Sequence, residues 1–126
     1  MSHYRYNRQV SPPAPFVYVS VCAAVEGTAA AECPAQLDTA ADLTVIPSRL
    51  VEDLQLDQLS EFPILGVDGH LSTLPTFLVQ IRIRELSPRV VEVVASPLEP
   101  YVLLGRDVLN HFRITLDGPN LVFDIE

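Results

Sequence analysis

Short runs of β-branched and aromatic residues recur along this chain, and most of them end at proline, glycine or an Asp–Gly pair. Runs of this kind are typical of strands, and the residues that close them favour turns. Only Pro47–Leu54 and Arg106–Phe112 have the character of short helices. The pattern therefore predicts a mainly β domain, a barrel or sandwich of about eight to ten short strands with two short helices.

One long run and one turn give the clearest hairpin. Leu71–Ile83 alternates apolar and polar residues over its second half, which predicts a strand with one buried face. Asp68–Gly69, just before it, is the strongest hairpin turn in the chain, and Phe62–Val67 supplies the other strand. The remaining strands that we expect are Phe16–Val21, Ala31–Leu37, Leu43–Ile46, Val90–Ala95, Tyr101–Leu104, Arg113–Leu116 and Leu121–Ile125, with a turn at Glu26–Thr28 after the first of them.

The length of 126 residues suits one domain and is short for two. Residues 1–15 end in a proline-rich stretch, Ser-Pro-Pro-Ala-Pro, and proline cannot complete a strand ladder. We expect residues 1–15 to form an extended N-terminal arm and residues 16–126 to form a single folded domain. With 48% hydrophobic and 19% charged residues, such a domain can bury a core.

A formal net charge of −8 limits the partners of the chain. Nucleic-acid binders concentrate Lys and Arg, and an anionic membrane repels an acidic surface, so we expect neither nucleic acid nor membrane as a partner. No apolar run reaches the roughly 20 residues of a membrane span, and no apolar signal core follows the polar N-terminus. These features predict a cytoplasmic protein, in which Cys22 and Cys33 are reduced rather than disulfide-bonded.

The segment Leu37–Asp42, with the sequence Leu-Asp-Thr-Ala-Ala-Asp, places the carboxylate of Asp38 between two apolar runs. An ionised carboxylate is costly in such surroundings unless hydrogen bonds or a charged partner support it. A lone Asp–Thr pair after a strand is ordinarily a turn or a cap. Two other segments favour a different interpretation: Leu103–Leu109, with the sequence Leu-Leu-Gly-Arg-Asp-Val-Leu, and the hairpin tip at Gly66–His70.

In this order and at this spacing, the three segments resemble the retropepsin-like, or retroviral-type, aspartic peptidases over residues 16–126. That family has an apolar residue before Asp-Thr/Ser-Gly-Ala, then a flap hairpin, then an apolar strand that runs into Leu-Gly-Arg-Asp. The resemblance implies a closed β-barrel, of the acid-protease-half type, with one or two short helices and a flap hairpin. It also implies an aspartic endopeptidase that hydrolyses extended peptides with no cofactor and no metal.

The resemblance also gives roles to particular residues. Asp38 is the catalytic group, and the mechanism uses two carboxylates, one as general base on a water and one as proton donor. Because the chain has one such motif, the resemblance implies a homodimer with one Asp38 from each subunit. Thr39 and Ala40 support the active-site loop. The other implied residues are Ala41, Asp42, Gly66, Val67, Asp68 and Gly69 for substrate binding, and Arg106 in an ion pair with Asp42.

Two details of the resemblance concern the chain ends and Ala40. Chain termini help to build the dimer sheet in that family, and apolar Leu121–Ile125 suits this role better than the proline-rich arm. Ala40 stands where the family has glycine, which permits positive φ and close backbone approach. A left-handed conformation there costs alanine about 1–2 kcal/mol; in any other conformation, the methyl group only narrows the central subsites.

Other hypotheses follow from the same residues. One is a catalytically inactive retropepsin-like module that dimerises or binds peptides. Another is a small β-barrel interaction domain, unrelated to the family, in which Asp38 is a turn residue. Asp107 has the position of a helix-capping group rather than of a catalyst. His3, His70 and His111 lack the spacing of metal ligands, so we expect no metal site.

Overall fold

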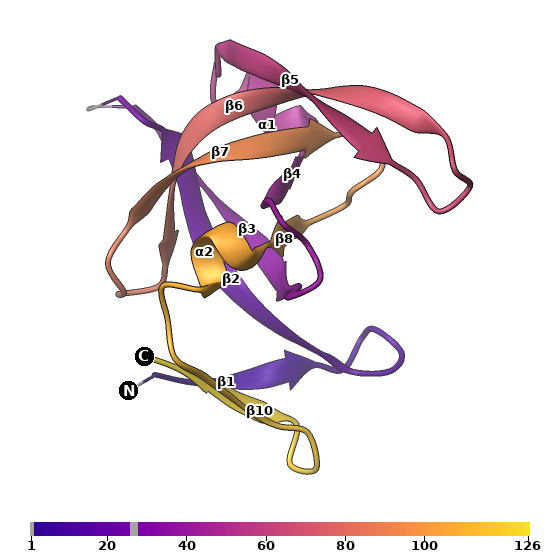
Figure 1. The fold of residues 1–126 in the computed structure, drawn as a ribbon. Coiled ribbons are helices and arrows are strands. Elements are labelled where there is room, and N and C mark those ends of the chain that lie inside the picture. Colours follow the sequence, from indigo (N-terminus) through magenta and orange to yellow (C-terminus); the bar gives the residue numbers. More distant parts are fainter. Residues whose placement is uncertain (1, 26–27) are drawn as a thin grey trace.

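The computed structural model of the protein describes residues 2–25 and 28–126, and its elements follow the predicted pattern (Figure 1). The strands are β1 Ser2–Asn7, β2 Ala14–Ala23, β3 Ala30–Leu37, β4 Val45–Pro47, β5 Gln58–Leu65, β6 Leu71–Ile83, β7 Arg89–Ser96, β8 Val102–Leu104, β9 Ile114–Asp117 and β10 Val122–Ile125. The helices are α1 Arg49–Asp53 and α2 Arg106–Leu109. The predicted turn at Glu26–Thr28 falls mostly outside the described residues. None of the described helices is long and apolar enough to cross a membrane.

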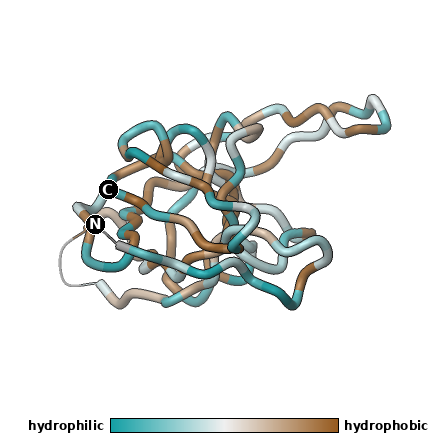
Figure 2. Tube along the Cα trace, turned by 90° about the horizontal axis from the view of Figure 1, so that it is seen from below, coloured by the Kyte–Doolittle hydropathy of each residue, from teal (hydrophilic) through white to brown (hydrophobic). Residues whose placement is uncertain are grey.

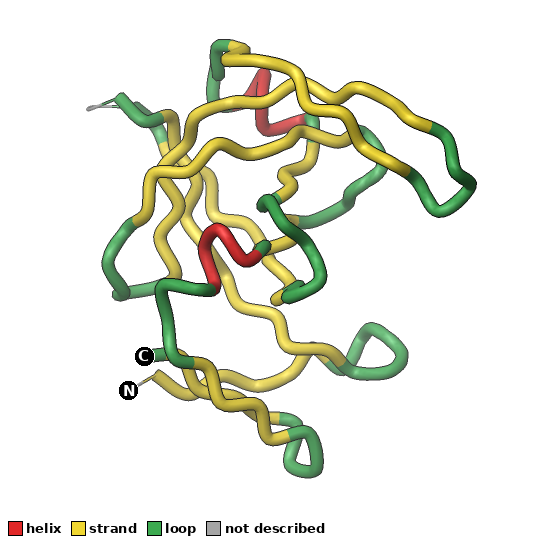
Figure 3. The backbone as a smooth tube through the Cα atoms, viewed as in Figure 1, coloured by secondary structure: helices red, strands yellow, loops and turns green. Residues whose placement is uncertain are grey.

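A closed barrel forms the body of the molecule. Its strands follow one another in the order β2, β3, β8, β4, β7 and β6, and antiparallel pairing of β6 with β2 completes the ring (Figure 3). Alternate residues of each strand point inward, and Val19, Val21, Val79 and Ile81 are at most 1% exposed. The prediction of a mainly β barrel with two short helices is therefore confirmed.

The part of the β5–β6 hairpin in which the two strands pair with each other extends beyond the barrel, and we call these residues, 58–77, the flap hairpin (Figure 2). Its ladder runs to the pair Leu65↔Leu71, and Gly69 completes the turn with a φ of 81°. Glycine adopts this left-handed conformation without steric cost. The hairpin carries a row of exposed apolar side chains at Leu59, Phe62, Leu65, Val67 and Leu71.

The N-terminal arm is more ordered than its prolines suggest. Its residues Ser2–Asn7 form β1, which pairs along most of its length with β10 at the other end of the chain. The ring of Phe123 stacks on Tyr4, with centroids 5.2 Å apart, and meets Tyr6 edge-on at 5.9 Å. No local pattern reveals this pairing, because both aromatic residues of the arm depend on a partner more than one hundred positions away.

The strand β10, which contains most of the predicted strand Leu121–Ile125, lies inside the sheet of its own chain, so its part in an intersubunit sheet stays a prediction. In the strand order β2–β1–β10–β9, both edges of β10 are already paired within the same chain. In this arrangement of a single chain, a strand with two paired edges has no ladder hydrogen bonds left for another subunit. Among the described strands at this end of the sheet, the open edge is that of β9.

Replacing Phe123 by alanine tests how firmly the arm is anchored. Phe123 is 1% exposed, so Phe123→Ala leaves a cavity between β10 and β1 and should lower the free energy of unfolding by about 3–5 kcal/mol. Urea denaturation measures this loss. Leu116→Ala on β9 is the control, because Leu116 is 55% exposed and should change stability by less than about 0.5 kcal/mol. Equal small losses in both variants would show that β1 and β10 do not pack as described.

Candidate active site

Asp38 lies where two parallel strands end side by side. β3 and β8 pair from Ala35↔Val102 to Leu37↔Leu104, and the Asp38 N–H continues the ladder by donating to the Leu104 carbonyl at 3.0 Å. The carboxylate is half-buried, and its Oδ1 accepts a hydrogen bond from the Ala40 N–H at 3.1 Å. The barrel thus fixes the backbone of Asp38, and its own loop orients the carboxylate.

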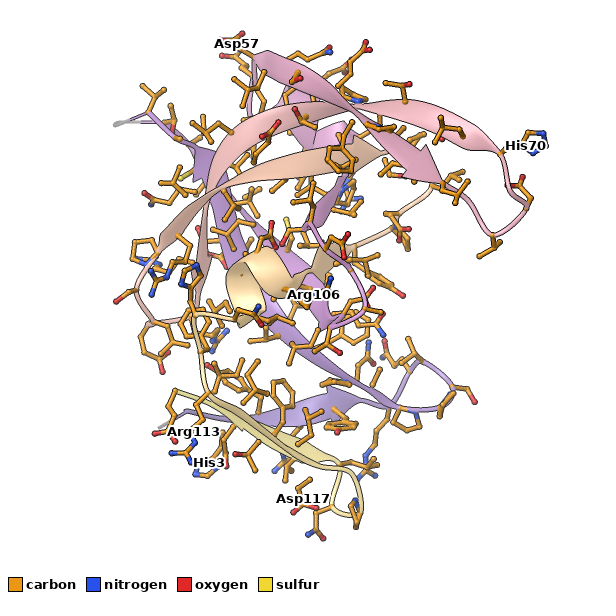
Figure 4. All side chains as sticks on the ribbon, viewed as in Figure 1. His3, Asp57, His70, Arg106, Arg113 and Asp117 are labelled. Atoms are coloured by element: carbon orange, nitrogen blue, oxygen red, sulfur yellow. The ribbon has the colours of Figure 1, made fainter. Side chains whose placement is uncertain are left out.

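Arg106 joins this loop to the start of α2. Its backbone N–H donates to the Ala41 carbonyl at 2.9 Å, and its Nη1 donates to the Thr39 carbonyl at 2.7 Å. Its Nη2 forms an ion pair with Oδ1 of Asp42. The structure therefore brings together the two residues that the sequence pairs, and Figure 4 shows Arg106 beside the loop. Three contacts from one side chain and its backbone restrain the loop on either side of Ala40.

A second set of hydrogen bonds, which the sequence did not predict, lies beneath the loop. Thr44 has no exposed surface; its hydroxyl donates to Oδ1 of Asp107 at 2.7 Å and accepts from the Gly105 N–H at 3.0 Å. The Thr44 N–H donates to the other oxygen of Asp107 at 3.0 Å. Asp107, in the first turn of α2, also accepts from the Val108 N–H at 2.9 Å, so one carboxylate contacts both the helix backbone and the loop.

Gly105 permits this close contact. A Cβ at that position would lie 2.6 Å from the carbonyl carbon of Leu43, which is backbone and cannot move aside. The glycine of the Leu-Leu-Gly-Arg-Asp segment is therefore a packing requirement between β8 and the loop, not a source of flexibility.

The variant Thr44→Val tests the hydrogen bonds of the buried Thr44 hydroxyl. The valine fills the same volume but leaves the buried Gly105 N–H without its partner and removes one of the two hydrogen bonds to Oδ1 of Asp107, which should cost about 1–3 kcal/mol of stability. Thr44→Ser keeps the hydroxyl and serves as the matched control. Thermal or urea unfolding of both variants gives the comparison. A valine variant as stable as the serine variant would remove Thr44 from this role.

Ala40 does not adopt the conformation that penalises a side chain. Among the described residues, positive φ at non-glycine positions occurs only at Gln55, Arg84 and Leu121. The backbone at Ala40 therefore carries no left-handed strain, and its methyl group is exposed on the same loop as Asp38. The methyl group of Ala40 therefore acts only by the space that it occupies next to any molecule that contacts the loop.

The tip of the flap hairpin is held by Asp68. Its Oδ1 accepts from the His70 N–H at 3.0 Å, and its Oδ2 lies 3.0 Å from Nδ1 of the same residue. The Gly66 N–H donates to the His70 carbonyl at 2.9 Å, and Val67 is fully exposed at the tip. Figure 4 shows His70 at the outer end of the flap hairpin, far from Arg106, so a single chain does not bring the tip to the Asp38 loop.

The hydrogen bonds from the backbone and the side chain of His70 lower the pKa of Asp68 below its usual value of 3.8. A lowered pKa means that the support from this carboxylate is complete above 3.8 and is lost as pH falls through the lower folded-state value. We therefore expect the side-chain carboxyl resonance of Asp68 to titrate with a midpoint below 3.8. NMR titration measures this. A titration midpoint at or above the usual value of 3.8 would contradict the lowered pKa of Asp68.

The two cysteines are free thiols. Burial raises the pKa of the Cys33 thiol, and the register places Cys33 opposite Val19 and Cys22 opposite Ala30. The two residues are therefore not a cross-strand pair. The described residues contain no group of three or more His, Cys, Asp or Glu side chains that could hold a metal ion.

A family model for aspartyl proteases matches residues 21–108, which include the Asp38 loop, the flap hairpin and the start of α2. The chain belongs to this family of aspartyl proteases. The resemblance to retropepsin-like proteases inferred from the three segments is thereby confirmed. No curated protein sequence matches the chain significantly.

Solved structures of retropepsin-like proteases share the fold of this aspartyl protease family member. The protease of EIAV, complexed with the inhibitor HBY-793, matches at a TM-score of 0.64 with 21% identity, over 86% of this chain and 93% of that one. A retropepsin-like aspartic protease from Rickettsia conorii matches at 0.67 with 13% identity, over 97% of this chain and 88% of that one. The simian foamy virus (mac) protease matches at 0.56 with 19% identity, over 76% and 92%.

Proposed function

We propose that this protein is an aspartic endopeptidase that works as a homodimer, with one Asp38 from each subunit at the two-fold axis. The observation that carries the proposal is the rigid presentation of a single Asp38 at the end of the β3–β8 pair, in a chain that belongs to the aspartyl protease family. One chain offers one carboxylate on this loop, and the chemistry needs two.

The geometry of the carboxylate suits such a pair. Among the described residues, the hydrogen bond made by the Asp38 side chain uses Oδ1, with the Ala40 N–H as donor. The other oxygen, Oδ2, is then available to a water or to the carboxyl group of a second subunit. Two like charges at close range cannot both ionise, so the pair shares one proton.

Each partner then has a distinct role in hydrolysis. The ionised carboxylate takes a proton from a water, whose oxygen attacks the scissile carbonyl carbon. The protonated carboxyl donates its proton to the carbonyl oxygen, which gives a neutral tetrahedral diol. The carbon–nitrogen bond then breaks: the carboxyl that took the proton from water donates it to the leaving amine, and the other carboxylate takes a proton from a hydroxyl of the diol, which restores the starting state. No covalent intermediate forms.

The substrate in this proposal is an extended peptide between the flap hairpin and the Asp38 loop. Ala41 and Asp42 lie on the loop to contact its backbone, and Gly66–Gly69 at the hairpin tip close over it and exclude water. The exposed methyl of Ala40 narrows the subsites beside the scissile bond. Exposed apolar side chains along the flap hairpin, at Phe62 and Leu65 among others, favour an apolar substrate surface.

Asp38→Asn tests the proposal. The asparagine keeps the shape of the loop but can neither accept the proton from water nor hold the shared one, so peptide hydrolysis should fall by at least about 10²-fold. Asp57→Asn is the matched control, because Asp57 is an exposed carboxylate that lies well apart from Arg106, the residue beside the Asp38 loop (Figure 4). Circular dichroism confirms that both variants fold, and a peptide library followed by mass spectrometry measures cleavage.

Three outcomes separate the hypotheses. Cleavage that persists in the Asp38→Asn variant would exclude the proposed site. A stable dimer with no turnover of any library peptide would favour the inactive module. Cleavage by the natural sequence whose specific rate does not fall on dilution, while sedimentation shows a monomer, would exclude the two-subunit site.

A further inference from the structure

The strand ladder of β2 has a break on the side away from β3. On that side β1 pairs with β2 at Ala14 and Pro15, and β6 pairs with it from Val19 onward. Residues 16–18 between them pair with β3 alone among the described strands. Successive residues of a strand direct their N–H and C=O groups to alternate sides, so part of this backbone faces the break.

Arg84 opens this break. β6 ends at Ile83, which pairs with Val19, and Arg84 follows with a φ of 51°. Arg84 begins the turn between β6 and β7, in which the Leu86 N–H donates to the Ile83 carbonyl at 2.9 Å; a long side chain rarely adopts this left-handed conformation, which costs on the order of 1 kcal/mol. The turn it makes carries the chain away from β2 where the ladder would otherwise continue.

A groove of about 520 Å³ lies along the break, between β1 and β2. Its lining includes the exposed side chains of His3, Arg5 and Arg84 and, among the described residues, no Asp or Glu. A groove lined by cationic side chains and by no carboxylate is unusual for a chain with a net charge of −8. The ion pairs of the described residues engage His3, through Asp124, but neither Arg5 nor Arg84.

Aromatic side chains also line the groove, and one of them carries a buried hydroxyl group. Phe16 and Tyr18 project from β2, and Tyr18 is 56% exposed. The hydroxyl of Tyr4 is buried without a hydrogen-bond partner in the described structure. Arg84 and Tyr18 also line an adjoining groove together with Glu32, Arg82 and Glu85, so the stretch without carboxylates ends at Arg84.

We propose that this groove binds an extended acidic peptide segment, which adds as a short strand to residues 16–18 of β2 and places its carboxylates on Arg5 and Arg84. Strand addition supplies backbone hydrogen bonds, and side-chain pockets supply selectivity. Arginine suits carboxylates because its planar guanidinium offers two parallel donors. None of the described residues that line the groove belongs to the Asp38 loop or to the flap hairpin, so the two sites are separate.

Fluorescence anisotropy tests the proposal with a fluorescein-labelled hexapeptide of alternating Glu and Val. The protein carries Asp38→Asn, so that hydrolysis does not consume the peptide and the result is independent of the proposed activity. Arg5→Gln and Arg84→Gln should each weaken binding about 3–10-fold, as expected for the loss of a charge-assisted hydrogen bond. Arg84→Gly removes the guanidinium but suits the left-handed backbone, so it should weaken binding without loss of fold.

Arg49→Gln is the matched control, since it removes an exposed arginine from another face and should change the affinity less than twofold. Bound peptide should also slow hydrogen exchange at the amides of residues 16–18. Equal binding of a Lys–Val hexapeptide, an equal loss in Arg49→Gln, or unchanged exchange at these amides would overturn the proposal. Tighter binding of single-stranded oligodeoxythymidylate than of the acidic peptide would assign the groove to nucleic acid instead.

Discussion

A buried threonine hydroxyl is the contact on which the site geometry depends. Thr44 links Asp107 and Gly105 across the gap between the Asp38 loop and α2, with no exposed surface of its own. Below it, the parallel β3–β8 pair fixes where the loop begins. Above it, Arg106 fixes the loop carbonyls. Asp38 is therefore held from both sides, and the proposed pairing with a second copy of Asp38 would need such rigidity.

Local patterns in the sequence were sufficient for most of the strands and for the hairpin, whereas the closed barrel was predicted only through the resemblance. The alternation in Leu71–Ile83 and the Asp68–Gly69 turn are properties of neighbouring residues, and strands form there as predicted. The Asp42–Arg106 pair also came from the sequence, but only through the resemblance, because 64 positions separate the two residues.

What the sequence did not reveal depends on contacts between distant segments. Thr44 is one polar residue between Leu43 and Val45, and nothing nearby marks it as buried with a partner in α2. The β1–β10 pairing joins the two ends of the chain, and the prolines of the arm gave the opposite impression. The strained turn at Arg84 has no local signal either, since glycine or asparagine is usual there.

Closure of the barrel has a consequence for how copies of this chain behave in concentrated solution. Most strands are paired on both sides, so among the described strands the sheet order ends only at β5 and β9. β5 carries Pro63, which lacks an N–H, and β9 is four residues long. Prolines and short lengths both discourage the open-ended stacking of strands that leads to fibrils. The protein thus keeps a long, apolar, exposed hairpin while offering few places for uncontrolled aggregation to begin.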